Sequence, residues 1–162
     1  MAELVNDGGS LRFVLSLAAR ETASLAPTGT AEASLRLLAG GGVEYLDHRD
    51  GEWWPILRLS ALYVPAQAVE QLANDLRALL AGSAPGFAWR PDEDAPLGLQ
   101  AGGEPGGAVV EVGIDVSRFL ADVAGAPLRA GSELALFRFR ATQDALVRFA
   151  GALVKELAEL GR

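Results

Sequence analysis

Several residue types that carry common protein chemistry are missing or rare in this sequence. None of the 162 residues is cysteine, which excludes disulfide bonds, iron–sulfur clusters, thiolate zinc sites and a cysteine nucleophile. His48 is the one histidine, so a single chain cannot bind a metal through two or more imidazoles. The longest segment without Asp, Glu, Lys or Arg runs only from Ala78 to Trp89, which is too short to span a bilayer.

Positive charge is also scarce. The chain has 14 Lys and Arg residues against 21 Asp and Glu residues, a net charge of −7, which argues against a nonspecific nucleic-acid binder. Between Pro91 and Ser117 there is no basic residue, and the acidic residues there are Asp92, Glu93, Asp94, Glu104, Glu111 and Asp115. Such a surface would attract a basic protein partner, although the same charge would also serve solubility alone.

Composition and length fit one folded domain. Half of the residues are hydrophobic and 22% are charged, which is typical of a packed globular chain. The first residues contain no basic region followed by an apolar core, so we expect a cytoplasmic protein that does not bind membranes. We expect residues 1–162 to form a single α+β domain in which 1–10 and 20–32 are irregular.

Hydrophobic periodicity predicts the elements of this domain. Apolar and polar residues alternate, as in half-buried strands, over 11–18, 33–39, 43–48, 54–63, 86–90, 97–101, 108–116 and 133–141. Helical spacing follows Pro65, where one apolar face comprises Val69, Leu72, Ala73, Leu76 and Leu80. The same spacing follows Thr142, where the face comprises Leu146, Phe149, Ala150, Leu153, Leu157 and Leu160. Thr142 is a good helix N-cap, and Gly82 suits a helix C-terminus.

These elements predict a mainly antiparallel sheet of about six to eight strands with two amphipathic helices on one face. The two helical patterns overlay with an offset of 77 residues, which suggests two halves, each made of strands followed by a helix. Two amphipathic helices on one sheet would give the same periodicity without any duplication. Gly40 to Gly42 is expected to form a hairpin turn, and residues 102–107 to join a second hairpin.

No motif identifies a catalytic residue, a cofactor or a metal ligand. Both glycine clusters lead into strands, whereas a phosphate-binding loop leads into a helix. Asp47 or Asp50 could orient His48 as a general base, but no nucleophile motif accompanies it. Carboxylates at 92–94 could bind a divalent cation, yet they lack the pattern of an EF-hand loop.

Most of the candidate binding residues lie in two charged loops, and two tryptophans lie beside the first loop. Trp53 and Trp54 follow the first charged turn, and exposed tryptophan is a frequent anchor of protein interfaces. Alternation places these two rings on opposite faces of a strand, and Trp89 is expected to pack against a helix. The predicted binding residues are Asp47, His48, Asp50, Trp53, Trp54, Asp92, Glu93 and Asp94.

Three segments together resemble a known group of proteins. They are Asp50-Gly51-Glu52-Trp53-Trp54, Glu111-Val112-Gly113-Ile114-Asp115-Val116 and the segment from Phe137 to Leu146. In this order they resemble small bacterial immunity proteins of the WapI kind and related uncharacterised bacterial domains. The resemblance implies a cytoplasmic protein that neutralises a toxin by binding it, and it implies no catalytic residues.

Three hypotheses therefore stand. The first is a non-catalytic protein-binding domain, such as an immunity protein, that meets a basic partner through its acidic surface. The second is a hydrolase or metal-dependent enzyme that uses His48 and the loop carboxylates. The third is a structural homo-oligomer, such as a homodimer, joined through a sheet edge or a helix face. An enzyme requires its reactive groups to converge in a pocket, whereas a binding domain can display them on an open face.

Overall fold

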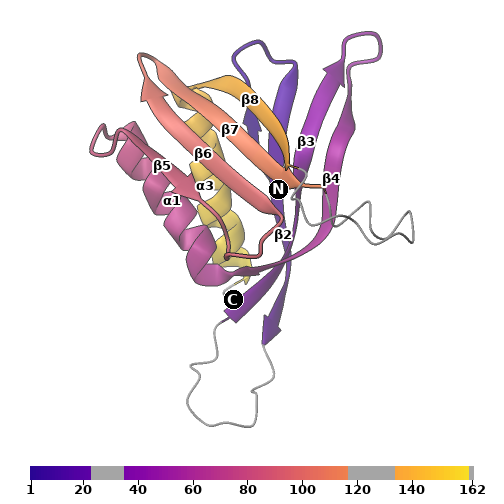
Figure 1. The fold of residues 1–162 in the computed structure, drawn as a ribbon, viewed down its shortest axis with the longest axis vertical. Helices are drawn as coiled ribbons and strands as arrows, with labels where there is room; N and C mark the ends of the chain where they lie inside the picture. Colours follow the sequence, from indigo (N-terminus) through magenta and orange to yellow (C-terminus); the bar gives the residue numbers. More distant parts are fainter. Residues whose placement is uncertain (23–34, 117–133, 161–162) are drawn as a thin grey trace.

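The computed structural model describes residues 1–22, 35–116 and 134–160, which contain eight strands and two helices. The strands form two antiparallel sheets with the orders β1-β2-β3-β4 and β5-β6-β7-β8 (Figure 1). The predicted α+β class and the antiparallel pairing are confirmed, and the strands are divided between two sheets. No described helix is both long and apolar enough to cross a membrane.

Each half of the chain has four strands followed by one helix, as the repeated pattern suggested. The first half consists of β1 (Ala2–Val5), β2 (Leu11–Thr22), β3 (Leu35–Asp47), β4 (Glu52–Pro65) and α1 (Ala66–Leu80). The second half consists of β5 (Gly86–Trp89), β6 (Leu97–Glu104), β7 (Gly107–Asp115), β8 (Leu134–Thr142) and α3 (Gln143–Leu160). The undescribed residues are 23–34, 117–133 and 161–162. They include most of the loop expected at 20–32, the first residues of the strands expected at 33–39 and 133–141, and Ser117 at the end of the acidic segment.

Both sheets and both helices contribute to one hydrophobic core. The predicted apolar faces of α1 and α3 pack into it, with Leu80, Leu157 and Leu160 only partly buried, and Phe149 of α3 is fully buried. The ring of Phe149 meets Phe13 of β2 edge-on, with 5.8 Å between the ring centroids. Trp89 packs against α1, as expected, and its indole Nε1–H donates a hydrogen bond to the Ala68 carbonyl oxygen at 2.6 Å.

The helix ends follow the local signals in the sequence. At the start of α3, the Thr142 hydroxyl Oγ1 accepts a hydrogen bond from the Ala145 backbone N–H at 3.3 Å. After α1, Gly82 adopts a φ of +69°, a left-handed conformation that glycine tolerates better than other residues. Both predicted caps are therefore confirmed.

The prediction that residues 1–10 are irregular is wrong for Ala2–Val5, which form the edge strand β1. Ala2 and Leu4 are fully buried, while Glu3 between them is exposed. Antiparallel pairing with Arg12–Leu15 of β2 stabilises this short edge strand, and a local pattern does not contain that pairing. Similarly, β2 continues to Thr22, through the first residues of the stretch 20–32 that was expected to be a loop.

The expected hairpin turn at Gly40 to Gly42 is also wrong, because these glycines lie inside the continuous strand β3. A Cβ atom on Gly42 would clash with the carbonyl oxygen of Leu57 on the neighbouring strand. A Cβ atom on Gly41 would lie 3.2 Å from Leu97 Cδ2, which belongs to the other sheet. The glycines therefore permit close packing of β3 against β4 and between the two sheets.

A bulge in β4 changes which of its residues face the core. The alternation over 54–63 would put Leu57, Leu59, Ala61 and Tyr63 on one face, but the pairing of β3 with β4 shifts between Ala39 and Gly41. Beyond the shift, Leu62 and Val64 are buried and Tyr63 is exposed. An extra residue in one strand reverses the inward and outward positions that follow it.

Candidate functional site

The first group of predicted binding residues forms the turn between β3 and β4. The Asp47 carboxylate accepts a hydrogen bond from the Arg49 N–H, and the Asp50 carboxylate accepts one from the Glu52 N–H, both at 2.9 Å. His48 is exposed, and within the described ranges no hydrogen bond links it to either carboxylate. Asp47 and Asp50 therefore stabilise the turn, and the geometry provides no oriented imidazole base.

The two adjacent tryptophans of this hairpin have different environments. Trp54 lies opposite Tyr45 in the register of β3 and β4, and 48% of Trp54 and 43% of Tyr45 are exposed. These two side chains share a face of the sheet, and we call them the hairpin aromatic pair. Trp53 is half-buried, and the Arg12 guanidinium lies 4.3 Å from the centre of its ring.

Beside Trp53, an ion-pair network crosses all four strands of the first sheet. Glu44 of β3 is at its centre, 2.7 Å from Arg12 of β2 and 2.6 Å from Arg58 of β4. Arg12 also contacts Glu3 of β1 at 2.6 Å. Local sequence patterns did not predict this network, although charged residues at alternating positions within the strands were a signal of it.

Glu44 is buried, with 3% of its surface exposed, and it stays charged because of its partners. Burial alone would raise the pKa of Glu44, since the charged form loses its hydration. The hydrogen bonds from Arg58 and Arg12, with the positive charges of both, outweigh this effect and lower the pKa. The network therefore fixes the sheet behind the hairpin aromatic pair, and we assign it a structural role.

The second group of predicted residues, Asp92, Glu93 and Asp94, lies elsewhere, in the loop between β5 and β6. The Asp92 carboxylate accepts a hydrogen bond from the Asp94 N–H at 3.0 Å, and all three residues are exposed. Figure 1 shows this loop far from the β3–β4 turn, so the fold does not bring the two groups together. In the part of the chain that the structure describes, no three His, Asp or Glu side chains are grouped to hold a metal ion.

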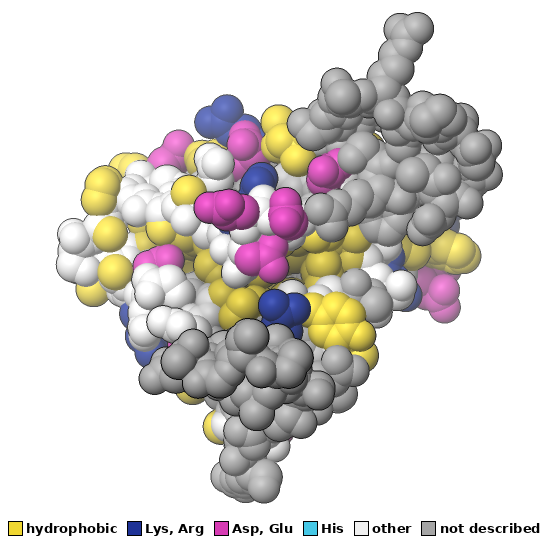
Figure 2. Space-filling view, turned by 60° about the horizontal axis from the view of Figure 1, so that its bottom comes forward, with side chains coloured by type: hydrophobic (Ala, Val, Ile, Leu, Met, Phe, Trp, Pro, Cys, Tyr) yellow, Lys and Arg dark blue, Asp and Glu magenta, His cyan; other side chains and the backbone are white. Residues whose placement is uncertain are grey.

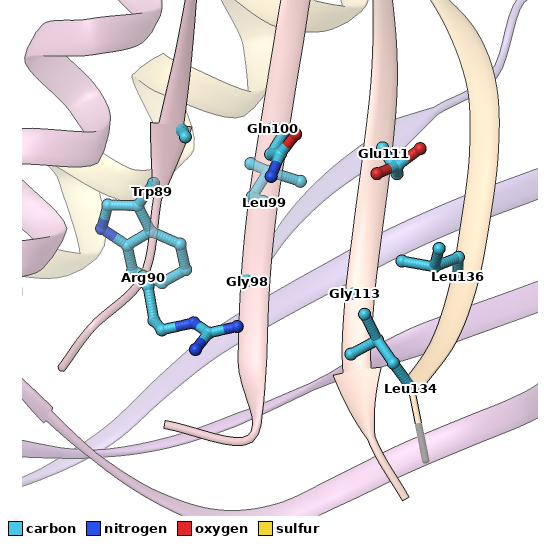
Figure 3. Close-up of a pocket in the computed structure, with 10 residues that line it drawn as sticks. Trp89, Arg90, Gly98, Leu99, Gln100, Glu111, Gly113, Leu134 and Leu136 are labelled. Atoms are coloured by element: carbon cyan, nitrogen blue, oxygen red, sulfur yellow. The ribbon is translucent and has the colours of Figure 1, made fainter. Parts of the chain in front are cut away.

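A shallow pocket with a volume of about 300 Å³ lies on the outer face of the second sheet (Figure 3). We call it the β5–β8 groove. Gly98 of β6 and Gly113 of β7 face each other in register and leave its floor without side chains. Leu134 and Leu136 of β8 form one wall and are 47% and 56% exposed, respectively. The side chain of Arg90 extends toward Gly98 from the opposite side.

One end of this groove is polar. Glu111 of β7 lies opposite Gln100 of β6, and both side chains line the groove (Figure 3). Glu111 is half-buried, and among the described residues it has no ion pair or side-chain hydrogen bond. Its register neighbour on β8 is Arg138, which is exposed. Glu111 belongs to the acidic segment between Pro91 and Ser117, but it was not among the predicted binding residues.

The acidic loop at 92–94 adjoins the other end of the groove. Arg90 donates a long hydrogen bond of 3.5 Å to the Glu93 carbonyl oxygen, and the Asp115 N–H donates one of 2.8 Å to the Pro96 carbonyl oxygen. Figure 2 brings the bottom of the Figure 1 view forward, and on this face acidic side chains gather beside apolar ones near the middle. Glu104 lies at the far end of β6 and contacts Arg140 at 3.3 Å, so it does not belong to this group.

Comparisons with known proteins identify no family. No family model matches the sequence, and no curated protein sequence matches it. Among solved structures, the chain is similar to the plant transcriptional regulator PBF-2 over 94% of this chain and 78% of that one. The sequence identity is 8% and the TM-score is 0.47, values at which the likeness says nothing about what this chain binds.

Proposed function

We propose that this chain is a non-catalytic protein-binding domain that works in the cytoplasm. The observation that supports it best is the hairpin aromatic pair, Tyr45 and Trp54, which is exposed at the end of a rigid sheet. Large aromatic rings contribute much of the binding energy in protein interfaces, and a rigid support lowers the entropy lost on binding. The acidic turn beside the pair would favour a basic partner.

The hydrolase hypothesis has no comparable support. His48 and the 92–94 carboxylates lie in separate loops, and the two aspartates nearest to His48 accept hydrogen bonds from the turn backbone. A catalytic site needs its acid, base and nucleophile within hydrogen-bond reach of one substrate. We therefore retain the binding hypothesis, with immunity against a toxin as its specific form.

Site-specific cross-linking tests the proposal. A photoreactive phenylalanine derivative at position 54 is irradiated in the full-length protein, in cells that produce it naturally. We expect one protein to be attached covalently, and an excess of unlabelled wild-type chain, but not of Trp54→Ala, to prevent the attachment. The matched control places the same group at Gln71, an exposed position of α1.

Two outcomes would contradict the proposal. Attachment only to a second copy of the chain would favour the homo-oligomer hypothesis. Equal labelling from positions 54 and 71 would show that the hairpin aromatic pair is not an interface. For the immunity form, if a neighbouring gene encodes a toxin, co-expression of this chain with that toxin should protect cells, and Trp54→Ala should reduce the protection.

A further inference from the structure

The shape of the β5–β8 groove suits a long, thin side chain. Gly98 and Gly113 leave a strip of bare backbone between the central strands of the sheet. A Cβ atom built on Gly113 would lie 3.5 Å from methyl carbons of both Leu134 and Leu136, so the two leucines border the space above this strip. A chain of methylene groups could lie on the strip and pack against the leucines.

The charge around the groove favours a cation. Among the described residues, four carboxylates lie in or beside it, and the two guanidinium groups nearby, Arg90 and Arg138, leave an excess of negative charge. The four are Asp92, Glu93, Asp94 and Glu111. Glu111 is half-buried without an ion pair in the described part of the chain, so it loses hydration without gaining a charged partner. A cation that binds beside Glu111 would replace the interaction with water that this carboxylate has lost.

From these two observations we infer that the β5–β8 groove binds an arginine side chain of a basic protein partner, with Glu111 receiving the guanidinium. The inference rests on the proposed function, because the occupant is a segment of the partner. The methylene stem lies over Gly98 and Gly113 against Leu136, and the planar guanidinium donates two hydrogen bonds to the Glu111 carboxylate. The Gln100 side-chain oxygen, on the neighbouring strand, can accept a further N–H.

Arginine fits this site better than an anion or a fully apolar side chain. An anion would meet Glu111 and the acidic loop, and a fully apolar side chain would leave the half-buried carboxylate unsatisfied. The guanidinium presents its N–H groups in a flat fork that matches the two oxygens of a carboxylate.

The test uses two short peptides and the full-length protein labelled with ¹⁵N. The first peptide is acetyl-Gly-Ser-Arg-Ser-Gly-amide. In the second, citrulline replaces arginine, which keeps the shape and removes the charge. We expect the arginine peptide to shift the amide signals of Gly98, Gly113 and Leu136 in a saturable way. The citrulline peptide should bind roughly tenfold more weakly, as expected when a hydrogen bond to a charged group is lost.

Two matched variants separate the groove from general acidity. Glu111→Gln and Glu104→Gln each remove one negative charge from the same sheet, but Glu104 lies outside the groove beside Arg140. We expect Glu111→Gln to weaken arginine-peptide binding about tenfold and Glu104→Gln to leave it nearly unchanged. Leu136→Ala should also weaken binding, although it changes no charge.

The inference is wrong if the citrulline peptide binds as well as the arginine peptide, if the two glutamate variants behave alike, or if the shifts are confined to residues 92–94. The absence of any shift at the groove amides would also overturn it. Each of these results leaves the cross-linking test at position 54 unaffected, because that test uses a different surface. The two proposals can therefore fail separately.

Discussion

Replacing Glu44 by glutamine should destabilise the protein, and the size of the effect can be worked from its contacts. Glu44 is buried, and the side chain of Arg12 is only 15% exposed, so this pair is shielded from water and salt. The side chain of Arg58 is 61% exposed, so its ion pair adds little, about 0–1 kcal/mol. Hydrogen bonds to charged groups contribute about 1.5–3 kcal/mol, and we expect a total loss of about 2–3 kcal/mol at neutral pH.

The pH dependence gives this prediction its sharper form. Because the pKa of Glu44 is lowered in the folded protein, its contribution is present above the ordinary glutamate pKa of about 4.3. The contribution decreases as the pH falls through the lowered pKa, since the carboxylate then becomes protonated. The difference in unfolding free energy between wild type and Glu44→Gln should therefore shrink in acid.

Urea unfolding measures this difference. Both proteins are unfolded at neutral pH and at about pH 3, which is well below the ordinary pKa of glutamate. Glu93→Gln is the matched control, because Glu93 is exposed in a loop and its carboxylate has no partner among the described residues. We expect this control to change stability by less than about 0.5 kcal/mol. If Glu44→Gln is as stable as wild type at neutral pH, or if the difference is the same at both pH values, the reasoning about the network is refuted.

Three further predictions concern the core, the glycine strand and the acidic loop. Phe149→Ala should lower the unfolding free energy by about 3–5 kcal/mol, because it leaves a cavity beside Phe13; a loss below about 1 kcal/mol in urea unfolding would contradict this. Gly42→Ala should cost at least about 2 kcal/mol in the same assay, since the added Cβ meets the Leu57 carbonyl oxygen, and an unchanged midpoint would argue against the close strand packing. Neutralising residues 92–94 together should slow association with a basic partner and flatten its salt dependence, measured by stopped flow at two salt concentrations; unchanged rates would mean that these charges only aid solubility.

The candidate binding residues show how far local reasoning reaches. The turn at 47–52 and the two tryptophans beside it could be grouped from the sequence, because they follow one another in the chain. The groove around Glu111 was not predicted, because its walls come from strands whose pairing only the fold establishes. Gly98 and Leu136 are 38 positions apart in the sequence, yet both line the groove.

Sequence alone determined the elements whose signals are local. The spacing of residues within single segments determined the apolar faces of α1 and α3 and their caps at Gly82 and Thr142. The repetition of the helical pattern indicated the division into two halves. Helical and strand periodicities are properties of neighbouring residues, and no distant contact is needed to recognise them.

Only the tertiary structure decided what depends on strand register and on packing between the sheets. Gly40 to Gly42 would serve a turn equally well in the sequence, and they became part of a strand because Leu57 and Leu97 approach their backbone. Glu44 is buried as a charged group because Arg12 and Arg58, from the two neighbouring strands, surround it. Close approach and charge pairing are settled by residues far apart in the chain, which a local pattern does not contain.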